Sequence, residues 1–381
     1  MKSFYAIASL LAGGGIGNTA YHAVAGLERA GRLQRLVALG HRPCDIPEER
    51  ITDVRFLPRR ALFPLGDKAF YWLKNRRFDL ACRRALRGDS SVVHLWNSQA
   101  TGTARQAKAA GQKLVIDRAS THILTQTDIL VDAYARFGIH YSPTYRETIE
   151  RCREEYELAD VVLTPSPNSY ESFAAHGFEL RKVVRCPFGV DFTKITPRRE
   201  PPERFVALFV GQIGVRKGVP TLLDAWDRAG LDGELWLAGG EEEAIRPHLV
   251  PWRDRPDIRW LGFRRDVPEL MRRASVFVFP SLEEGSALVT YEAMAAGLPL
   301  IVTPAAGSVA RPGEEALFVD AYDADGLAAA LTELQANPDR AATMGHRARG
   351  RVEQFPWQAY GDRVAAVHAA LESGESLPVF E

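Results

Sequence analysis

Short apolar runs alternate along this chain with longer segments in which apolar residues recur every three or four positions. Such runs are typical of strands buried on both faces, and the longer segments are typical of amphipathic helices. Their regular alternation predicts parallel sheets whose strands are joined by crossover helices. In the first half of the chain, the predicted strands are residues 3–11, 36–39, 92–94, 113–116, 161–163 and 182–185.

A proline-rich segment at 196–202, TPRREPP, separates this series from a second one. Three prolines among charged residues fit neither a helix nor a strand, so this segment is the predicted linker. The sequence therefore predicts an α/β protein of two tandem doubly wound, Rossmann-like domains, residues 1–196 and 203–355, which face a cleft at the carboxyl ends of their strands. The strands predicted beyond the linker are residues 205–210, 234–237, 258–260, 276–279, 300–302 and 317–319.

The composition argues against several classes of protein. The 381 residues suffice for two domains, and 48 Lys and Arg against 48 Asp and Glu leave no net field to attract nucleic acid. The four cysteines include no C-x-x-C pair, which argues against zinc, iron–sulfur and disulfide frameworks and fits a reducing cytoplasm. Residues 4–12 have the length of a signal-peptide core, but we prefer a buried strand that leads into a glycine turn.

The strongest candidate for chemistry is the string EEGSALVTYEAMAAGLPLIVT at 283–303, which follows the predicted strand VFVF. Because Gly285 interrupts the string, we expect a helix to begin near Leu288, with its free amides facing an anionic phosphate. Glu292 then reaches a ribose diol from the first turn, since a carboxylate accepts hydrogen bonds from vicinal hydroxyls. The alternative is that Glu284 and Glu292 are solvated surface acids, as most glutamates are.

This string resembles the E-x7-E signature of the retaining family-four glycosyltransferases of GT-B fold, and AMAAGLPLI resembles the continuation of that signature. The resemblance implies metal-independent transfer of a hexose-type sugar from a nucleotide diphosphate donor that the C-terminal domain holds. It also implies that Glu284 contacts the donor sugar. The further donor-binding positions that it implies are Gly285, Leu288, Val289 and Glu292.

A second constellation is FVGQIGVRKGVPTLL at 209–223, a strand that runs into a glycine loop carrying Arg216 and Lys217. Two cations beside loop amides can stabilise a departing nucleoside diphosphate. The loop resembles the V-G-R-x-x-x-x-K-G segment of the same family, which implies that Lys217 binds the donor phosphates. Gln212 stands in the usual arginine position, and Arg216 is the candidate replacement. The alternative is an exposed turn with two solvated charges.

Glycines cluster near the N-terminus, where GIGNTA at 15–20 satisfies the dinucleotide pattern G-x-G-x-x-A. The strand at 36–39 is not followed by the acid that a nicotinamide ribose requires, although Arg42 suits NADP. In the resembled family, this loop lets the backbone approach the donor diphosphate. We therefore assign Gly15 and Gly17 to donor binding, since glycine permits close approach. A plain tight turn is the remaining alternative.

His122 follows the predicted strand at 113–116, at the edge where a parallel sheet presents ligand-contacting groups. The family resemblance implies that His122 contacts the donor sugar. Without that resemblance, a lone histidine is more often a structural residue. Asp117 and Arg118 are weaker candidates nearby.

Further agreements extend the resemblance over nearly the whole chain: ADVVLTPS at 159–166, FGVD at 188–191 and LGFRRDVP at 261–268. The last of these implies a base pocket formed by backbone near Gly262 and Phe263. FPWQAY at 355–360 opens a C-terminal helix. The resemblance implies that this helix, within residues 356–381, crosses back onto the first domain.

Residues 55–87 form a basic, aromatic segment that matches no family motif. Ten Lys and Arg against two Asp and Glu give it a net charge of +8. Such a segment suits contact with an anionic bilayer and a lipid-linked acceptor, which predicts a cytoplasmic protein peripheral to the inner face of the membrane. The alternative is a solvated helix whose aromatic residues enter the core. The aromatic residues are Phe56, Phe63, Phe70, Tyr71, Trp72 and Phe78.

The sequence thus predicts a hexosyltransferase in which Glu284, His122 and Lys217 act on the donor. It predicts no metal ion and no cofactor beyond the nucleotide diphosphate sugar, which is a substrate. The expected acceptor is a glycan, a lipid or a small molecule, and nucleic acid is not an expected partner. The alternatives on the same fold are a sugar-nucleotide epimerase, a phosphorylase and a catalytically silent sensor. An NADP-dependent oxidoreductase built on the Gly15 loop is less favoured.

Overall fold

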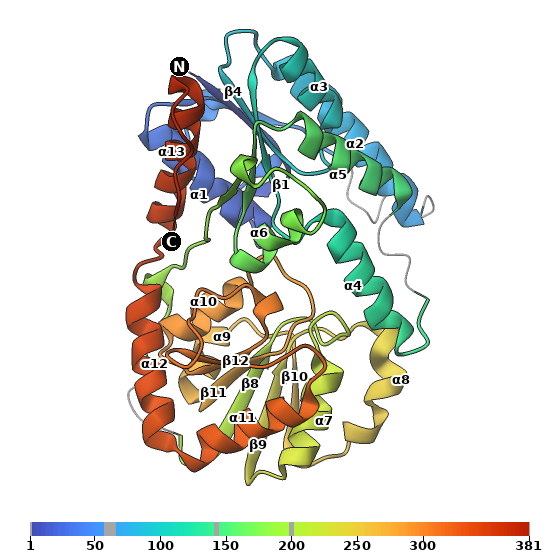
Figure 1. The fold of residues 1–381 in the computed structure, drawn as a ribbon, viewed down its shortest axis with the longest axis vertical. Coiled ribbons are helices and arrows are strands. Elements are labelled where there is room, and N and C mark those ends of the chain that lie inside the picture. Colours follow the sequence, from blue (N-terminus) through green and yellow to red (C-terminus); the bar gives the residue numbers. More distant parts are fainter. Residues whose placement is uncertain (1, 57–65, 141–144, 198–201, 381) are drawn as a thin grey trace.

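The structure, a computed structural model, describes residues 2–56, 66–140, 145–197 and 202–380. It contains two α/β domains, each built on one parallel sheet (Figure 1). This arrangement confirms the predicted fold class. Residues 198–201 of the predicted linker and residues 57–65 of the basic segment, Phe63 among them, lie outside the described residues.

The N-terminal sheet has seven strands in the order β3-β2-β1-β4-β5-β6-β7, and all neighbours are parallel. All six strands predicted here are found, and the seventh, β3, was not predicted. The strands are β1 (Ser3–Leu11), β2 (Leu33–His41), β3 (Ile51–Asp53), β4 (Val92–Trp96), β5 (Lys113–Asp117), β6 (Val161–Thr164) and β7 (Val183–Arg185). The helices are α1 (Ile16–Arg29), α2 (Gly66–Ala85), α3 (Thr101–Ala109), α4 (Ile123–Ala135), α5 (Arg146–Leu158) and α6 (Pro167–Ala174).

The C-terminal sheet has six parallel strands in the order β10-β9-β8-β11-β12-β13. All six correspond to predicted strands, and β13 is displaced by one residue from its predicted bounds. The strands are β8 (Phe205–Val210), β9 (Gly233–Ala238), β10 (Ile258–Gly262), β11 (Val276–Phe279), β12 (Leu300–Val302) and β13 (Ala316–Phe318). The helices that follow the linker are α7 (Val219–Ala229), α8 (Arg246–Leu249), α9 (Val267–Arg273), α10 (Leu288–Ala295), α11 (Ala324–Ala336), α12 (Pro338–Val352) and α13 (Trp357–Ser373).

Each sheet reverses its winding between two neighbouring strands. The chain moves outward from β1 to β3 on one side and from β4 to β7 on the other, so the first switch point lies between β1 and β4. The second lies between β8 and β11. Connections diverge at such a point and leave a crevice at the carboxyl edge, where ligands of doubly wound sheets bind. Residues 211–218 after β8 and 280–287 after β11 therefore occupy the binding edge of the C-terminal sheet.

The last helix, α13, packs against α1 of the N-terminal domain (Figure 1). A Cβ on Gly26 of α1 would collide with the backbone of Gly361 of α13, so glycine lets the two helices approach closely. The ring of His22 stacks on Trp357, with ring centroids 4.4 Å apart. The first strand and the last helix thus belong to the same domain.

Helix α4 extends from the N-terminal domain toward α8 of the other domain (Figure 1). The Tyr134 hydroxyl donates a hydrogen bond to Glu242, and the ring centroids of Phe137 and His248 are 5.3 Å apart. These contacts link the two domains beside the binding edge. The domains therefore meet through side chains as well as through the linker and α13.

Candidate active site

Two loops at the switch point of the C-terminal sheet are bonded to each other. The amide of Leu282 donates to the carbonyl of Arg216 at 2.8 Å, and the Ser281 hydroxyl donates to the same carbonyl at 3.1 Å. Gly218 has a φ of 68°, and a Cβ there would strike the carbonyl of Pro280. The local sequence thus folds so that Arg216 and its neighbour face the loop that carries the glutamate pair.

The two cations of the first loop are paired with the two glutamates of the second. The Lys217 ammonium lies against the Glu284 carboxylate, and these side chains are only 13% and 12% exposed. A guanidinium nitrogen of Arg216 lies 3.3 Å from Glu283, and another lies 3.8 Å from Glu284. Burial lowers the pKa of Lys217 below its ordinary value, against the opposing attraction of Glu284. The structure therefore brings Arg216, Lys217 and Glu284 together, as the sequence analysis expected of one site.

Glu283 belongs to this cluster, although the sequence analysis did not select it. Its side chain is fully buried, and it accepts hydrogen bonds from Ser120, Thr121 and Gln126 of the N-terminal domain. The only sequence signal for this residue was its position directly before Glu284. Its partners lie far away along the chain, so sequence spacing alone does not reveal them.

The predicted helix start at Leu288 agrees with the structure, in which α10 begins at that residue. Leu288, Val289 and Glu292 are partly exposed, whereas Thr290 and Tyr291 are buried. The first two flank the helix mouth, where backbone amides have no partner within the helix. The accessible face of α10 thus consists of positions that the sequence analysis assigned to the donor.

Glu292 is the fifth residue of α10, so it stands just beyond the first turn rather than within it. Burial raises the pKa of its carboxyl to about 7. The group is therefore close to half-ionised at neutral pH. A ligand that donates hydrogen bonds to this carboxylate would favour the ionised form.

Gly285 is held against the N-terminal domain. Its carbonyl accepts hydrogen bonds from the hydroxyls of Ser166 at 2.5 Å and Ser169 at 3.1 Å. A Cβ on Gly285 would meet the backbone of Ala119. Glycine at this position therefore lets the two domains approach each other, which is a separate function from the predicted contact with the donor.

The two glycines assigned near the N-terminus have different surroundings. Gly15 is exposed, has a φ of 58° and has open space where a Cβ would stand. Gly17 is buried, and a Cβ there would strike the carbonyl of Leu10. Close packing of α1 on β1 thus accounts for Gly17, whereas Gly15 keeps its backbone accessible at the carboxyl edge of the sheet.

His122 directly follows Thr121, which bonds to Glu283 of this cluster, but the ring of His122 has other partners. Its side chain is 5% exposed, and its ring lies among Tyr156, Phe173 and His176, with the His176 centroid 4.3 Å away. It also caps α4 by accepting a hydrogen bond from the amide of Leu124. Burial lowers the pKa of His122 to about 3, so the ring is neutral. These contacts favour the structural alternative over a contact with the donor sugar.

The predicted base-pocket residues lie at the end of β10, an edge strand. Gly262 has a φ of 62°, and Phe263 is 78% exposed. Two strand spacings separate β10 from β8, roughly 10 Å. Gly262 and Phe263 therefore share the binding edge with Arg216 and Lys217.

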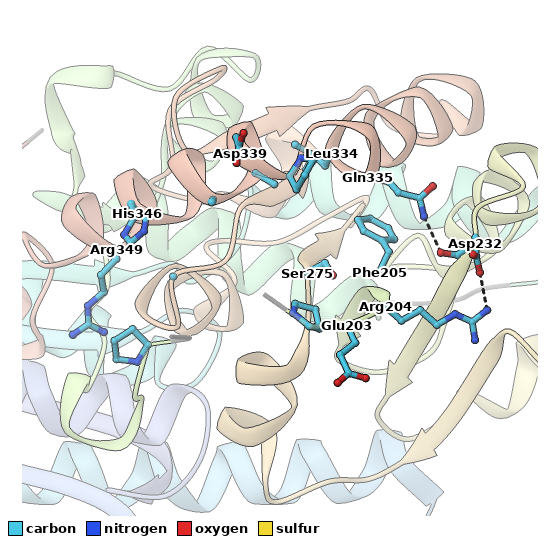
Figure 2. A pocket seen from close by; sticks show the side chains of 16 residues that line it. Glu203, Arg204, Phe205, Asp232, Ser275, Leu334, Gln335, Asp339, His346 and Arg349 are labelled. Atoms are coloured by element: carbon cyan, nitrogen blue, oxygen red, sulfur yellow. Dashed lines mark hydrogen bonds and ion pairs between the residues drawn. The ribbon is translucent and has the colours of Figure 1, made fainter. Parts of the chain in front are cut away.

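A cavity of about 730 Å³ opens on the other edge of the C-terminal sheet (Figure 2). It is lined by Phe205 at the start of β8, by Asp232 before β9 and by Ser275 before β11. Arg216 and Lys217 follow the opposite end of β8, so this cavity is not part of the candidate site. Across the described ranges, no cluster of three or more His, Cys, Asp and Glu side chains is arranged to hold a metal ion.

Two family models match the chain. Residues 13–194 match Glycosyltransferase Family 4, and residues 204–337 match Glycosyl transferases group 1. The alpha-maltose-1-phosphate synthase of Mycobacterium tuberculosis is 33% identical over 175 residues, which cover 41% of this chain and 45% of that protein. This chain therefore spans less than half the length of that relative.

Solved structures resemble this one over almost the whole chain. Sucrose-phosphate synthase from Thermosynechococcus elongatus has a TM-score of 0.72 at 20% identity, with 98% of this chain and all of that chain covered. HepE from Anabaena, in complex with UDP and glucose, has a TM-score of 0.68 at 16% identity, with 97% and 100% covered. The chain thus carries a glycosyltransferase family 4 domain followed by a group 1 glycosyltransferase domain, and its structural neighbours are glycosyltransferases of the GT-B fold.

Proposed function

We propose that this protein is a metal-independent, retaining glycosyltransferase that moves a hexose-type sugar from a nucleotide diphosphate sugar to an acceptor. The observation that carries the proposal is the convergence of Arg216 and Lys217 with Glu284 and the accessible face of α10 at one switch point. Cations beside a helix N-terminus match the charge of a pyrophosphate. The solved complex of HepE with UDP and glucose supports a nucleotide sugar as the donor.

The ion pairs assign a role to each charged group. Glu284 occupies Lys217 in this structure, so a bound pyrophosphate takes its place on the ammonium. The released Glu284 carboxylate then accepts hydrogen bonds from hydroxyls of the donor sugar. Glu292, one turn into α10, binds the ribose diol, and the backbone at Gly262 and Phe263 lies beside the base.

The reaction needs charge stabilisation more than a nucleophile. The bond between the anomeric carbon and the donor phosphate oxygen breaks while the acceptor oxygen bonds to the same face of that carbon. The proton of the acceptor hydroxyl passes to the departing phosphate oxygen. Arg216, Lys217 and the amides at Leu288 and Val289 stabilise the negative charge that develops on the nucleoside diphosphate.

The acceptor in this proposal is a lipid-linked or cell-envelope glycan at the inner face of the membrane. The α2 face supports membrane contact, because Trp72 is 51% exposed with the Arg76 guanidinium carbon 5.0 Å from its ring centroid. Tyr71 is also exposed, and the Lys74 ammonium lies 5.1 Å from its ring centroid. Phe70 and Phe78 are instead buried, as the structural alternative expected for the aromatic residues.

No helix of the described chain is both long enough and apolar enough to cross a bilayer. Membrane contact in this proposal is therefore peripheral and rests on the exposed α2 side chains. Their cations attract anionic lipid, and their rings enter the headgroup region.

Other activities on this fold find less support. An epimerase or a phosphorylase would also use the cations, but no contact among the described residues favours either one. The oxidoreductase alternative required a dinucleotide at the Gly15 loop, and the close packing of Gly17 on Leu10 explains that glycine without a ligand.

The experiment that tests the proposed function is a thermal-shift panel with UDP, GDP and ADP sugars, followed by turnover with the donor that binds. A ligand that binds only the folded state raises the free energy of unfolding by an amount that grows with the logarithm of its affinity. Proton NMR of the product then gives the configuration at the anomeric carbon. Retention supports the proposal, whereas inversion or a failure of all donors to bind contradicts it.

A further inference from the structure

The carboxylate of Glu283 is buried at the junction of the two domains. It belongs to the C-terminal domain, but most of its partners belong to the other. One oxygen accepts from the hydroxyls of Ser120 and Thr121 and, at 3.2 Å, from the Thr121 amide. The other oxygen accepts from the Gln126 side chain at 3.1 Å and faces Arg216 at 3.3 Å. Glu283 thus joins loop 118–122 and α4 to the candidate active site.

The contacts of Glu283 favour its ionised form. Burial alone would raise the pKa of Glu283, but the hydrogen bonds from Ser120 and Gln126 and the charge of Arg216 outweigh it, so the pKa is lowered. An ionised carboxylate only accepts hydrogen bonds, and every partner named here is a donor. This buried charge therefore depends on donors that the other domain supplies.

The contact between Glu283 and Arg216 is a weak one in this arrangement. Charge-assisted pairs between a guanidinium and a carboxylate commonly close to about 2.8 Å, whereas this one measures 3.3 Å. Gln126 shares the same carboxylate oxygen. With the domains together, the Glu283 carboxylate therefore binds both Arg216 and the donors of the N-terminal domain.

We propose that Glu283 is a positioning residue that couples domain closure to the availability of Arg216, which rests on the proposed function of Arg216 in donor binding. When the domains separate, Glu283 loses its donors from Ser120, Thr121 and Gln126, and Arg216 becomes its principal partner. The guanidinium is then drawn onto Glu283 and away from the donor phosphates. Closure restores those donors, and the pair between Glu283 and Arg216 is weakened to the 3.3 Å contact seen here.

The coupling is reciprocal. A donor pyrophosphate that attracts Arg216 weakens the pair between Arg216 and Glu283. The hydrogen bonds from the N-terminal domain then become the main stabilisation of the Glu283 carboxylate, and this favours closure. Ser120 and Gln126 thus influence the binding of phosphates that they do not touch. They act through Glu283, so they are positioning residues and not catalytic ones.

The test uses Gln126→Ala and Glu283→Gln in the full chain, with Ser169→Ala as the matched control. Ser169 also bonds across the junction, but to the Gly285 carbonyl rather than to the Glu283 carboxylate. Two quantities are measured for each protein: the affinity for UDP and the radius of gyration by X-ray scattering with and without UDP. If Glu283→Gln fails to fold, Gln126→Ala carries the test.

We expect Gln126→Ala to weaken UDP binding at least about fivefold and to remain more extended than the wild type, whereas Ser169→Ala changes the affinity little. In a double-mutant cycle, Arg216→Ala removes most of the effect of Gln126→Ala on UDP affinity. Unchanged UDP affinity in both Gln126→Ala and Glu283→Gln, or additive effects in the cycle, would overturn the coupling alone. Failure of the wild type to bind any of UDP, GDP and ADP would instead overturn the proposed function and the coupling with it.

Discussion

The ammonium group of Lys217 lies against the carboxylate of Glu284, and both side chains are nearly buried at the carboxyl edge of the C-terminal sheet. The candidate phosphate site is therefore occupied by an internal anion. A ligand phosphate must compete with Glu284 for the same cation. Because of this competition, we expect replacement of Glu284 to strengthen UDP binding and replacement of Lys217 to weaken it, although both replacements lower turnover.

Replacing Glu284 with glutamine removes the competitor while it keeps the shape of the side chain. We expect Glu284→Gln to bind UDP more tightly, on the order of tenfold, because the buried ammonium has lost its partner. Turnover falls roughly 100-fold, because the contact with the sugar is weakened in the transition state. Calorimetry and initial rates measure the two effects. Glu314→Gln, at an exposed pair with Arg311, is the control. Weaker UDP binding by Glu284→Gln would contradict this account.

Replacing Lys217 has the opposite effect on binding. We expect Lys217→Ala to weaken UDP binding and to lower kcat/KM by roughly 100-fold to 1,000-fold, because charge on the departing diphosphate loses its nearest cation. Circular dichroism should show an intact fold. Lys113→Ala, at the first residue of β5 and hence at the other edge of its sheet, is the control. Wild-type turnover in Lys217→Ala would remove this residue from the site.

The carboxyl of Glu292 titrates near neutrality, which gives a signature in stability. Burial raises its pKa from 4.5 to about 7, so the folded protein retains a proton that the unfolded chain releases between these values. The contribution of Glu292 to stability is therefore greatest at low pH and declines as the pH rises toward 7. Relative to the wild type, Glu292→Gln gains up to about 3 kcal/mol between pH 4 and pH 8. Urea unfolding at both pH values measures the gain, and an equal difference at both would refute it.

The same titration affects donor binding. The ionised carboxylate is the better acceptor for ribose hydroxyls, so affinity for the nucleotide sugar rises as the pH passes through 7. Glu292→Gln lacks this rise, and Glu292→Ala loses most activity without unfolding. Titration calorimetry from pH 6 to pH 8 distinguishes the two proteins. Parallel pH profiles would show that Glu292 does not face the ribose.

His122 offers a test between a structural and a sugar-binding role. We expect His122→Ala to lower the free energy of unfolding by about 2 kcal/mol, because α4 loses its cap and an aromatic cluster loses a ring. kcat of the folded fraction stays near the wild-type value. His122→Asn, which can also cap a helix, recovers part of the stability. A large loss of kcat in a stable His122 variant would restore the role in sugar binding that the sequence analysis proposed.

The exposed face of α2 is tested with vesicles. We expect the protein to sediment with vesicles that contain anionic lipid, and less at high salt, because cationic side chains accompany its exposed rings. Trp72→Ala weakens this binding, whereas Phe78→Leu, at a buried position of the same helix, leaves it unchanged where the variant is folded. Equal sedimentation with neutral and anionic vesicles, or none with either, would contradict membrane contact through α2.

Most of the fold was predictable because parallel strands buried on both faces form continuous apolar runs. The bounds of β1, β8, β11 and β12 match the predicted ones. The strand β3 was missed because Ile51–Asp53 contains only one apolar residue. Its extended conformation is stabilised by pairing with β2. The register with β12 likewise fixes the bounds of β13, which the local sequence placed one residue too late.

The position of the candidate site was predictable where it depends on local sequence. Arg216 and Lys217 lie in one loop, and Glu284 precedes one helix, so strand–loop–helix reasoning placed each of them correctly at the binding edge. The place of Glu283 in this cluster was not predictable, because its hydrogen bonds come from Ser120 and Gln126, which folding brings from the other domain.

The central claim is that Arg216, Lys217 and the mouth of α10 hold a donor pyrophosphate. A crystal structure of the protein with a bound nucleotide diphosphate tests it most directly. The account predicts phosphate oxygens at about 2.8 Å from Lys217 and Arg216, with Glu284 turned away from Lys217. A nucleotide bound at the cavity beside Phe205 and Ser275, with the Lys217–Glu284 pair intact, would contradict it.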